Sequence, residues 1–131
     1  MKHLLAALVV ALAAPVSAGT FGPYSELLVF GDSLSDPGNK AKLTDNTSPN
    51  PDFYPKRQFT NGDTWAKQLG ADIGTNFAYG DARATENGDE FPDFSAQVDL
   101  FKAALADTDS PLNVGDNPLA AVWFGGNDLR D

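Results

Sequence analysis

Three short apolar runs, each ending at a glycine, constrain the fold of this chain more than any other feature. The runs cover Leu27–Phe30, Thr75–Gly80 and Pro118–Phe124, and the last is followed by Gly125. Apolar character that is continuous rather than alternating is typical of strands buried on both faces of a parallel sheet. Helical stretches lie between the runs. The order strand, helix, strand, helix, strand predicts a right-handed α/β sheet.

The clearest helical pattern covers Asp93–Ala106. Four apolar residues recur there at helical spacing: Phe94, Val98, Phe101 and Leu105. This spacing predicts an amphipathic helix that turns these four side chains toward the core.

A shorter helix is predicted over Thr64–Leu69, with Asp63 as its N-cap and Gly70 as its end. The stretch Asp36–Asp63 before it is rich in Pro, Asn, Asp and Gly, and we expect a long loop with one short helical piece near Lys40. A loop of this length in a compact domain is usually functional or mobile. We therefore expect it to help set substrate choice.

The first residues have the pattern of a secretory signal peptide. A basic start at Lys2 is followed by an apolar stretch over Leu4–Ala14 and by small residues up to Ala18. The apolar stretch is too short to anchor the chain across a bilayer. The sequence predicts a signal peptide over residues 1–18, a domain over residues 19–131 with no transmembrane anchor, and a secreted or periplasmic location.

Charge and cysteine content exclude several classes of protein. The chain has 18 acidic and 9 basic residues, with a formal net charge of −9, and its only histidine is His3. Such a surface argues against binding to nucleic acid or to anionic membranes. There is no cysteine, so disulfides and a cysteine-linked lipid anchor are excluded.

Polar groups follow each of the three predicted strands. The carboxyl ends of parallel strands meet at one edge of a sheet, where α/β proteins place their chemistry. Ser33 follows the first strand and is held out of the sheet as a candidate nucleophile. The N–H of Gly80 is free of a blocking side chain, and Asn127 offers a neutral amide donor. A serine with such donors nearby suits acyl transfer through an oxyanion.

Four segments carry a resemblance to the GDSL esterase/lipase family, also called SGNH hydrolases. They are FGDSLSD, RQFTNGDTWAKQL, NFAYGDA and WFGGNDL, in that order along the chain. The resemblance implies a flavodoxin-like three-layer α/β/α fold, incomplete in this chain, and hydrolysis of lipid or acylated-sugar esters without a cofactor or metal.

The resemblance also implies the roles of the site residues. Ser33 is the nucleophile, and the oxyanion hole consists of Ser33 N–H, Gly80 N–H and the side chain of Asn127. Three further residues are expected to support this site: Asp32, Gly125 and Asp128. We expect Asp128 to brace its own loop rather than act as a base.

Two departures from the family pattern matter. Asp81 stands where a second glycine is frequent, and we expect its carboxylate to point to solvent, away from the oxyanion. The family's Asp-x-x-His block, which supplies the base, does not occur in residues 1–131. A serine without a base is a weak nucleophile. We therefore expect an N-terminal portion of a hydrolase, with the His and Asp in further C-terminal sequence and little esterase activity in this chain.

Other interpretations of the same residues remain open. Ser35 fits a cap or a loop hydrogen-bonder better than a second nucleophile. Asp32 and Asp36 are a weak match to the carboxylate pair of a glycosidase, because adjacency to a strand end does not set their separation. The acidic segment 86–93 lacks the alternating ligands of a calcium loop, so no metal site is predicted there. The alternative function is a non-catalytic binding protein, or a truncated remnant, on the same scaffold.

Overall fold

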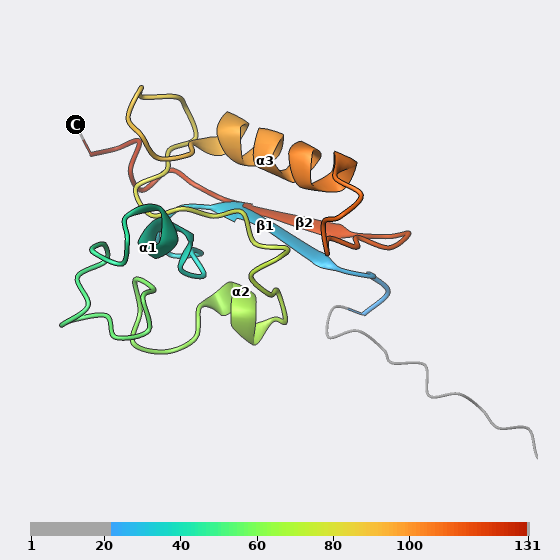
Figure 1. Ribbon diagram of the computed structural model, residues 1–131, viewed down its shortest axis with the longest axis horizontal. Helices are drawn as coiled ribbons and strands as arrows, with labels where there is room; N and C mark the ends of the chain where they lie inside the picture. Colours follow the sequence, from blue (N-terminus) through green and yellow to red (C-terminus); the bar gives the residue numbers. More distant parts are fainter. Residues whose placement is uncertain (1–21, 131) are drawn as a thin grey trace, which may run out of the picture.

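The computed structural model describes residues 22–130. Its elements, in chain order, are β1 (Leu27–Gly31), α1 (Asn39–Leu43), α2 (Trp65–Gln68), α3 (Phe94–Ala106) and β2 (Leu119–Trp123). The helix α3 covers one face of the sheet, and α1 and α2 lie on the other side (Figure 1). The predicted α/β class is confirmed, while the complete flavodoxin-like sheet stays a prediction. The predicted signal peptide and His3 lie outside the described residues.

The two strands are parallel and pair from Leu27↔Leu119 to Gly31↔Trp123. The remaining predicted strand, Thr75–Gly80, lies along the opposite edge of β1, but it forms only an isolated parallel bridge, Val29↔Asn76. Three backbone bonds hold it there: Val29 N to Thr75 O (3.0 Å), Phe77 N to Val29 O (2.8 Å) and Tyr79 N to Gly31 O (3.1 Å). β1 is therefore central, because its odd-numbered residues bond to segment 75–79 and its even-numbered residues face β2.

Side-chain amides explain why segment 75–79 is not a regular strand. The Asn39 side chain donates to the carbonyl oxygens of Asn76 (2.8 Å) and Ala78 (3.1 Å). The Asn76 side chain accepts from the Ala78 N–H at 3.0 Å and donates to Ser35 O at 2.8 Å. Side chains thus form the hydrogen bonds that the backbone of a further strand would otherwise form with this segment.

Both faces of β1 are buried, as the continuous apolar run predicts. On one face, Leu27 and Val29 pack with Ala66 and Ala71. On the other, Phe30 stacks on the ring of Phe77, with centroids 5.6 Å apart. β2 differs from the prediction, because Val122 and Trp123 remain 57% and 54% exposed. Within the described residues β2 is an edge strand with no neighbour on its outer side.

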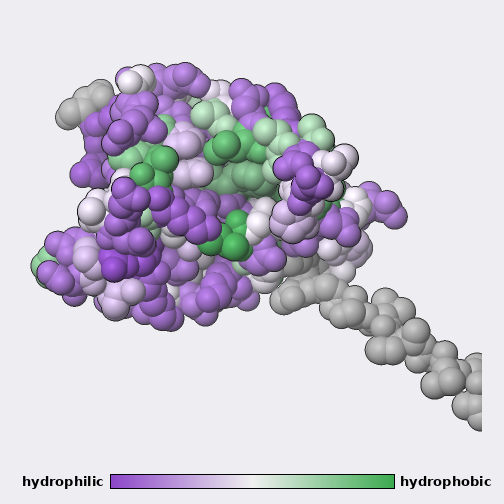
Figure 2. Space-filling view, in the orientation of Figure 1, coloured by the Kyte–Doolittle hydropathy of each residue, from purple (hydrophilic) through white to green (hydrophobic). Residues whose placement is uncertain are grey.

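The long helix confirms its predicted extent and, except for Leu105, its predicted core face. α3 begins one residue later than expected, and Phe94 and Phe101 meet the ring of Phe30 edge-on. Leu105, however, is 53% exposed, and the fully buried side chain of the helix is Gln97. In Figure 2 apolar surface gathers over α3 and the adjoining sheet, while the loops near α1 are mostly polar.

The short helices lie close to their predicted positions. α1 is the expected helical piece near Lys40. The N-cap of α2 is Thr64 rather than Asp63, because the extended Thr64 accepts the Lys67 N–H on its hydroxyl at 3.3 Å. Asp63 instead forms an ion pair with Lys67 at 3.2 Å. No helix within residues 22–130 is long and apolar enough to cross a membrane.

Candidate active site

The turn after β1 is clamped by the backbone and side chain of Asp32. Its N–H donates to Trp123 O (3.2 Å), which ties the end of β1 to the end of β2. Its carboxylate accepts the Leu34 N–H at 3.0 Å, and its carbonyl accepts from Ser35 N and Asp36 N. Asp32 is 3% exposed, and burial, with a smaller contribution from the charge of Asp128, raises the pKa of its carboxyl. The peptide groups on both sides of Ser33 are therefore fixed.

Ser33 itself is only partly buried, and it takes no part in the hydrogen bonds that Asp32 forms. Within residues 22–130, neither its N–H nor its hydroxyl forms a hydrogen bond. A free hydroxyl beside a free N–H, on a rigid turn, is the arrangement that an attacking serine with an oxyanion donor requires.

Ser35, by contrast, is a structural residue. Its side chain is fully buried, and its hydroxyl accepts the indole N–H of Trp65 at 3.1 Å. A Cβ placed on Gly31 would lie 2.8 Å from this hydroxyl, so a side chain there would displace the turn. This confirms Ser35 as a loop hydrogen-bonder.

The N–H of Gly80 has a partner that the sequence interpretation did not foresee. It donates to Asp36 Oδ2 at 2.9 Å. The same buried carboxylate accepts three N–H groups at the start of α1, from Gly38 (2.7 Å), Asn39 (2.6 Å) and Lys40 (3.2 Å). Burial, partly offset by these bonds, raises the pKa of Asp36. An oxyanion would have to share or replace the Asp36–Gly80 bond to use this donor.

Close packing also explains the glycine at position 80. A Cβ there would lie 2.3 Å and 2.6 Å from two ring atoms of Phe59 and 2.7 Å from Lys40 Cδ. Real Cβ atoms essentially never show contacts this short, so a side chain at position 80 would have to displace Phe59 and Lys40.

Asn127 is held near the same sheet edge by the loop that follows β2. Its amide donates to Ala82 O at 2.9 Å, which leaves its second amide hydrogen for another acceptor. Gly125 adopts φ +119, which L side chains rarely adopt, and this lets the chain turn sharply after β2. A Cβ on Gly126 would lie 3.8 Å from Asp32 Oδ2, so this loop lies against the turn that carries Ser33.

Asp128 braces its loop, as expected. Its carboxylate accepts the N–H groups of Ala84 (3.0 Å) and Thr85 (3.2 Å). These bonds, the one from Ala84 above all, lower the pKa of Asp128. The loop after Gly80 and the loop after β2 are thereby joined.

The expectation that Asp81 points to solvent is met only in part. Its side chain is 48% exposed, but it forms an ion pair with Lys40, whose side chain is only 5% exposed. The Lys40 ammonium also lies 3.9 Å from the ring centroid of Phe91. The ammonium therefore neutralises the carboxylate charge next to Gly80.

Gln97 is the site-related residue that sequence reasoning missed. Its side-chain amide bonds to both backbone groups of Gly31, the last residue of β1. The signal in the sequence is a polar residue inside the apolar stripe of α3, between Phe94 and Phe101. Helical spacing alone treats such a residue as part of the polar face.

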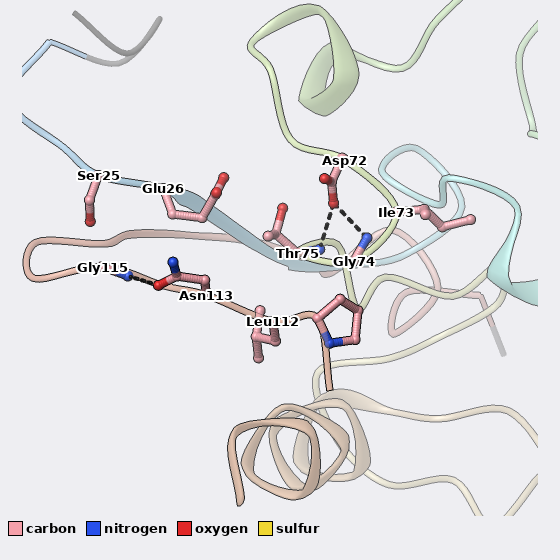
Figure 3. Close-up of a pocket in the computed structure, with 10 residues that line it drawn as sticks. Ser25, Glu26, Asp72, Ile73, Gly74, Thr75, Leu112, Asn113 and Gly115 are labelled. Carbon is pink, nitrogen blue, oxygen red and sulfur yellow. Dashed lines mark hydrogen bonds between the residues drawn. The ribbon is translucent and has the colours of Figure 1, made fainter. Parts of the chain in front are cut away.

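Two cavities differ in their relation to this site. One, of about 490 Å³, lies at the start of β1, opposite the end that carries Ser33, and its lining includes Glu26, Asp72 and Thr75 (Figure 3). A second, of about 350 Å³, adjoins the candidate oxyanion donor and is lined by Asp81, Arg83, Asn87, Asp89, Asn127 and Arg130. Only the second belongs to the candidate site, and its lining is polar throughout.

Comparison with known proteins agrees with the geometry. A family model described as GDSL-like Lipase/Acylhydrolase matches residues 27–131, which include all three strand ends. A search of curated proteins found no match. The chain belongs to the GDSL-like lipase/acylhydrolase family.

Proposed function

We propose that this chain carries the nucleophile and oxyanion donors of an exported serine hydrolase that cleaves carboxylic esters. The observation that carries the proposal is Ser33, whose hydroxyl and N–H are both free on a turn fixed by Asp32. Family membership supports the reaction class. Export rests on the signal-peptide pattern of residues 1–18.

In the proposed reaction, Ser33 Oγ bonds to the ester carbonyl carbon while its proton passes to a base. The tetrahedral oxyanion is stabilised by Ser33 N–H and the Asn127 amide. Its collapse breaks the bond to the alcohol oxygen, which leaves with that proton. Water then hydrolyses the acyl group from Ser33 by the same route.

Gly80 N–H is proposed as a third donor that acts only when its bond to Asp36 is shared with the oxyanion. One such donor contributes about 3 to 4 kcal/mol to transition-state stabilisation. Recruiting Gly80 would therefore offset the weakening of its hydrogen bond to the Asp36 carboxylate, since a bond to a charged group contributes about 1.5 to 3 kcal/mol net.

The base is proposed to be a histidine, oriented by an aspartate, outside the described residues. Residues 22–130 contain no histidine, and Asp128 is already engaged by Ala84 and Thr85. Chain 1–131 is then expected to hydrolyse esters very slowly, since losing the base lowers turnover on the order of a millionfold.

The cavity beside Asn127 favours one substrate class over another. Its lining is polar and includes both carboxylates and guanidinium groups. Such a surface suits hydroxyl-rich alcohols, which hydrogen-bond to it, better than long acyl chains, which would bury its charges. We propose acylated sugars over lipids as the substrate class.

An added base tests the proposal on the chain as it is. The chain is incubated with a fluorophosphonate probe, with and without imidazole, and the labelled serine is located by peptide mass spectrometry. The expected result is labelling of Ser33 that increases with imidazole and disappears in Ser33→Ala. Labelling elsewhere, or none at any imidazole concentration, contradicts the proposal. Binding of acetylated sugars without labelling would favour the non-catalytic alternative.

A further inference from the structure

Gln97 occupies an unusual position for a polar residue. Its side chain is fully buried in the first turn of α3, between Phe94 and Phe101, which pack on Phe30. A buried amide destabilises a fold unless its hydrogen bonds are satisfied. The partners of Gln97 therefore indicate why an amide is present there.

Those partners are the backbone groups of one strand residue. Gln97 Oε1 accepts the Gly31 N–H at 2.9 Å, and Nε2 donates to Gly31 O at 2.9 Å. Nε2 also donates to Pro92 O at 2.9 Å, just before α3. The side chain thus uses one acceptor and both amide hydrogens, and it links the start of α3 to the end of β1.

The amide substitutes for a missing strand partner. In a regular parallel ladder, the Gly31 N–H would bond to Phe77 O, continuing the pattern that Val29 begins with Thr75 and Phe77. Segment 75–79 does not continue as a strand, and Gln97 Oε1 takes the place of that carbonyl. The Gly31 N–H is therefore held by a side chain from 66 residues away, while Gly31 O is shared between that side chain and the Tyr79 N–H.

We propose that Gln97 is a positioning residue for the nucleophile, an inference that rests on the proposed function. Gly31 precedes Ser33 by two residues, and a Cβ added to it would lie 2.8 Å from Ser35 Oγ. Rotation of the Gly31 peptide would turn the Ser33 N–H and hydroxyl away from a bound ester. A misplacement of about 1 Å lowers the rate of reaction about 100-fold, so the orientation of this peptide bears directly on reactivity.

The test compares Gln97→Met, which keeps the length of the side chain but removes its hydrogen bonds, with Val98→Ala, which removes packing one residue away. Labelling of Ser33 by the fluorophosphonate is measured with imidazole as a function of probe concentration. Positioning predicts that Gln97→Met lowers the limiting rate constant about 10- to 100-fold and leaves the half-saturating probe concentration unchanged. Val98→Ala should change neither once both are corrected for folded fraction. Equal limiting rates in Gln97→Met and wild type overturn the proposal.

A second measurement is independent of reactivity. Amide hydrogen exchange at Gly31 should be about tenfold faster in Gln97→Met, because one hydrogen bond is lost. Unchanged exchange overturns the proposal even if Ser33 is not the nucleophile, whereas failure of wild-type labelling alone contradicts only the proposed function. If Gln97→Met does not fold, Gln97→Asn, one methylene shorter, is measured in the same two ways against the same expectations.

Discussion

The N–H of Gly80 donates a 2.9 Å hydrogen bond to the buried carboxylate of Asp36. This bond joins the turn that carries Ser33 to the end of the segment beside β1, across 44 residues. Asp36 also caps the first N–H groups of α1. One carboxylate thus organises two strand ends of the site.

Asp36→Asn should destabilise the chain by about 2 to 3 kcal/mol, because an amide nitrogen would face N–H donors where an oxygen now accepts. Unfolding in urea measures the change. Asp63→Asn is the matched control, since Asp63 is exposed and pairs only with surface lysines, and it should leave the unfolding midpoint unchanged. Equal midpoints for both variants would contradict the role of Asp36.

Gly80→Ala should destabilise the chain by about 1 to 3 kcal/mol through overpacking against Phe59. Gly62→Ala is the control, because the nearest atom to its added Cβ lies 4.0 Å away. In the double variant Gly80→Ala/Phe59→Ala the added methyl has room, so the two costs should not add. Additive costs in thermal unfolding would show that Phe59 is not the cause.

Substitution of the two serines of the turn should have opposite effects on probe labelling and on stability. Ser33→Ala should abolish probe labelling and leave stability nearly unchanged, because its hydroxyl has no hydrogen-bond partner within the described residues. Ser35→Ala should keep the labelling and lower stability by about 0.5 to 1.5 kcal/mol, because the Trp65 indole N–H loses its acceptor. Labelling and urea unfolding of both variants test this. The reverse pattern would assign the nucleophile to Ser35.

Removing Lys40 and removing Asp81 should lower the free energy of unfolding by different amounts. Asp81→Asn leaves a buried ammonium without its counter-ion, whereas Lys40→Met leaves a carboxylate that water already reaches. Asp81→Asn should therefore lower the free energy of unfolding more than Lys40→Met does, by about 1 kcal/mol or more, because an uncompensated buried charge destabilises a fold more than an exposed one. Urea unfolding of the two variants measures the order. A larger loss for Lys40→Met would indicate that the contact of Lys40 with Phe91 dominates.

The raised pKa of Asp32 predicts a specific pH dependence. The folded state binds this proton more tightly than the unfolded state, so protonation of Asp32 stabilises the fold. This contribution is fully present below the ordinary value of 3.8 and is lost as pH increases through the raised pKa. The free energy of unfolding of wild type, relative to that of Asp32→Asn, should accordingly fall as the pH increases from 3.8 through the raised pKa.

Asp128→Asn tests the cause of the Asp32 shift. It removes the minor charge contribution, so the pKa of Asp32 should fall yet stay above 3.8, because burial is the main cause. A carboxyl ¹³C NMR titration measures the pKa of Asp32 in wild type and in Asp128→Asn. A return to 3.8 would assign the shift to Asp128 instead of burial.

Local sequence patterns were sufficient for the elements that carry the site. Continuous apolar runs ending at glycine predicted β1 and β2 within one or two residues, and periodicity predicted α3, because burial and backbone geometry impose these patterns locally. The position of Ser33 just after β1 followed from the same reasoning. The motifs around it indicated the family, which the match over residues 27–131 confirmed.

Tertiary structure decided which polar groups face one another. Gln97 with Gly31, Asp36 with Gly80, and Lys40 with Asp81 are pairs separated by 66, 44 and 41 residues. A buried polar side chain is chosen by the partner it satisfies after folding, and that partner leaves no local pattern in the sequence. The sequence by itself therefore determined where the strands end and which serine follows the first one. Only the folded chain decided that the N–H of Gly80 is held by a carboxylate and that an amide from α3 bonds to Gly31, just before the turn that carries Ser33.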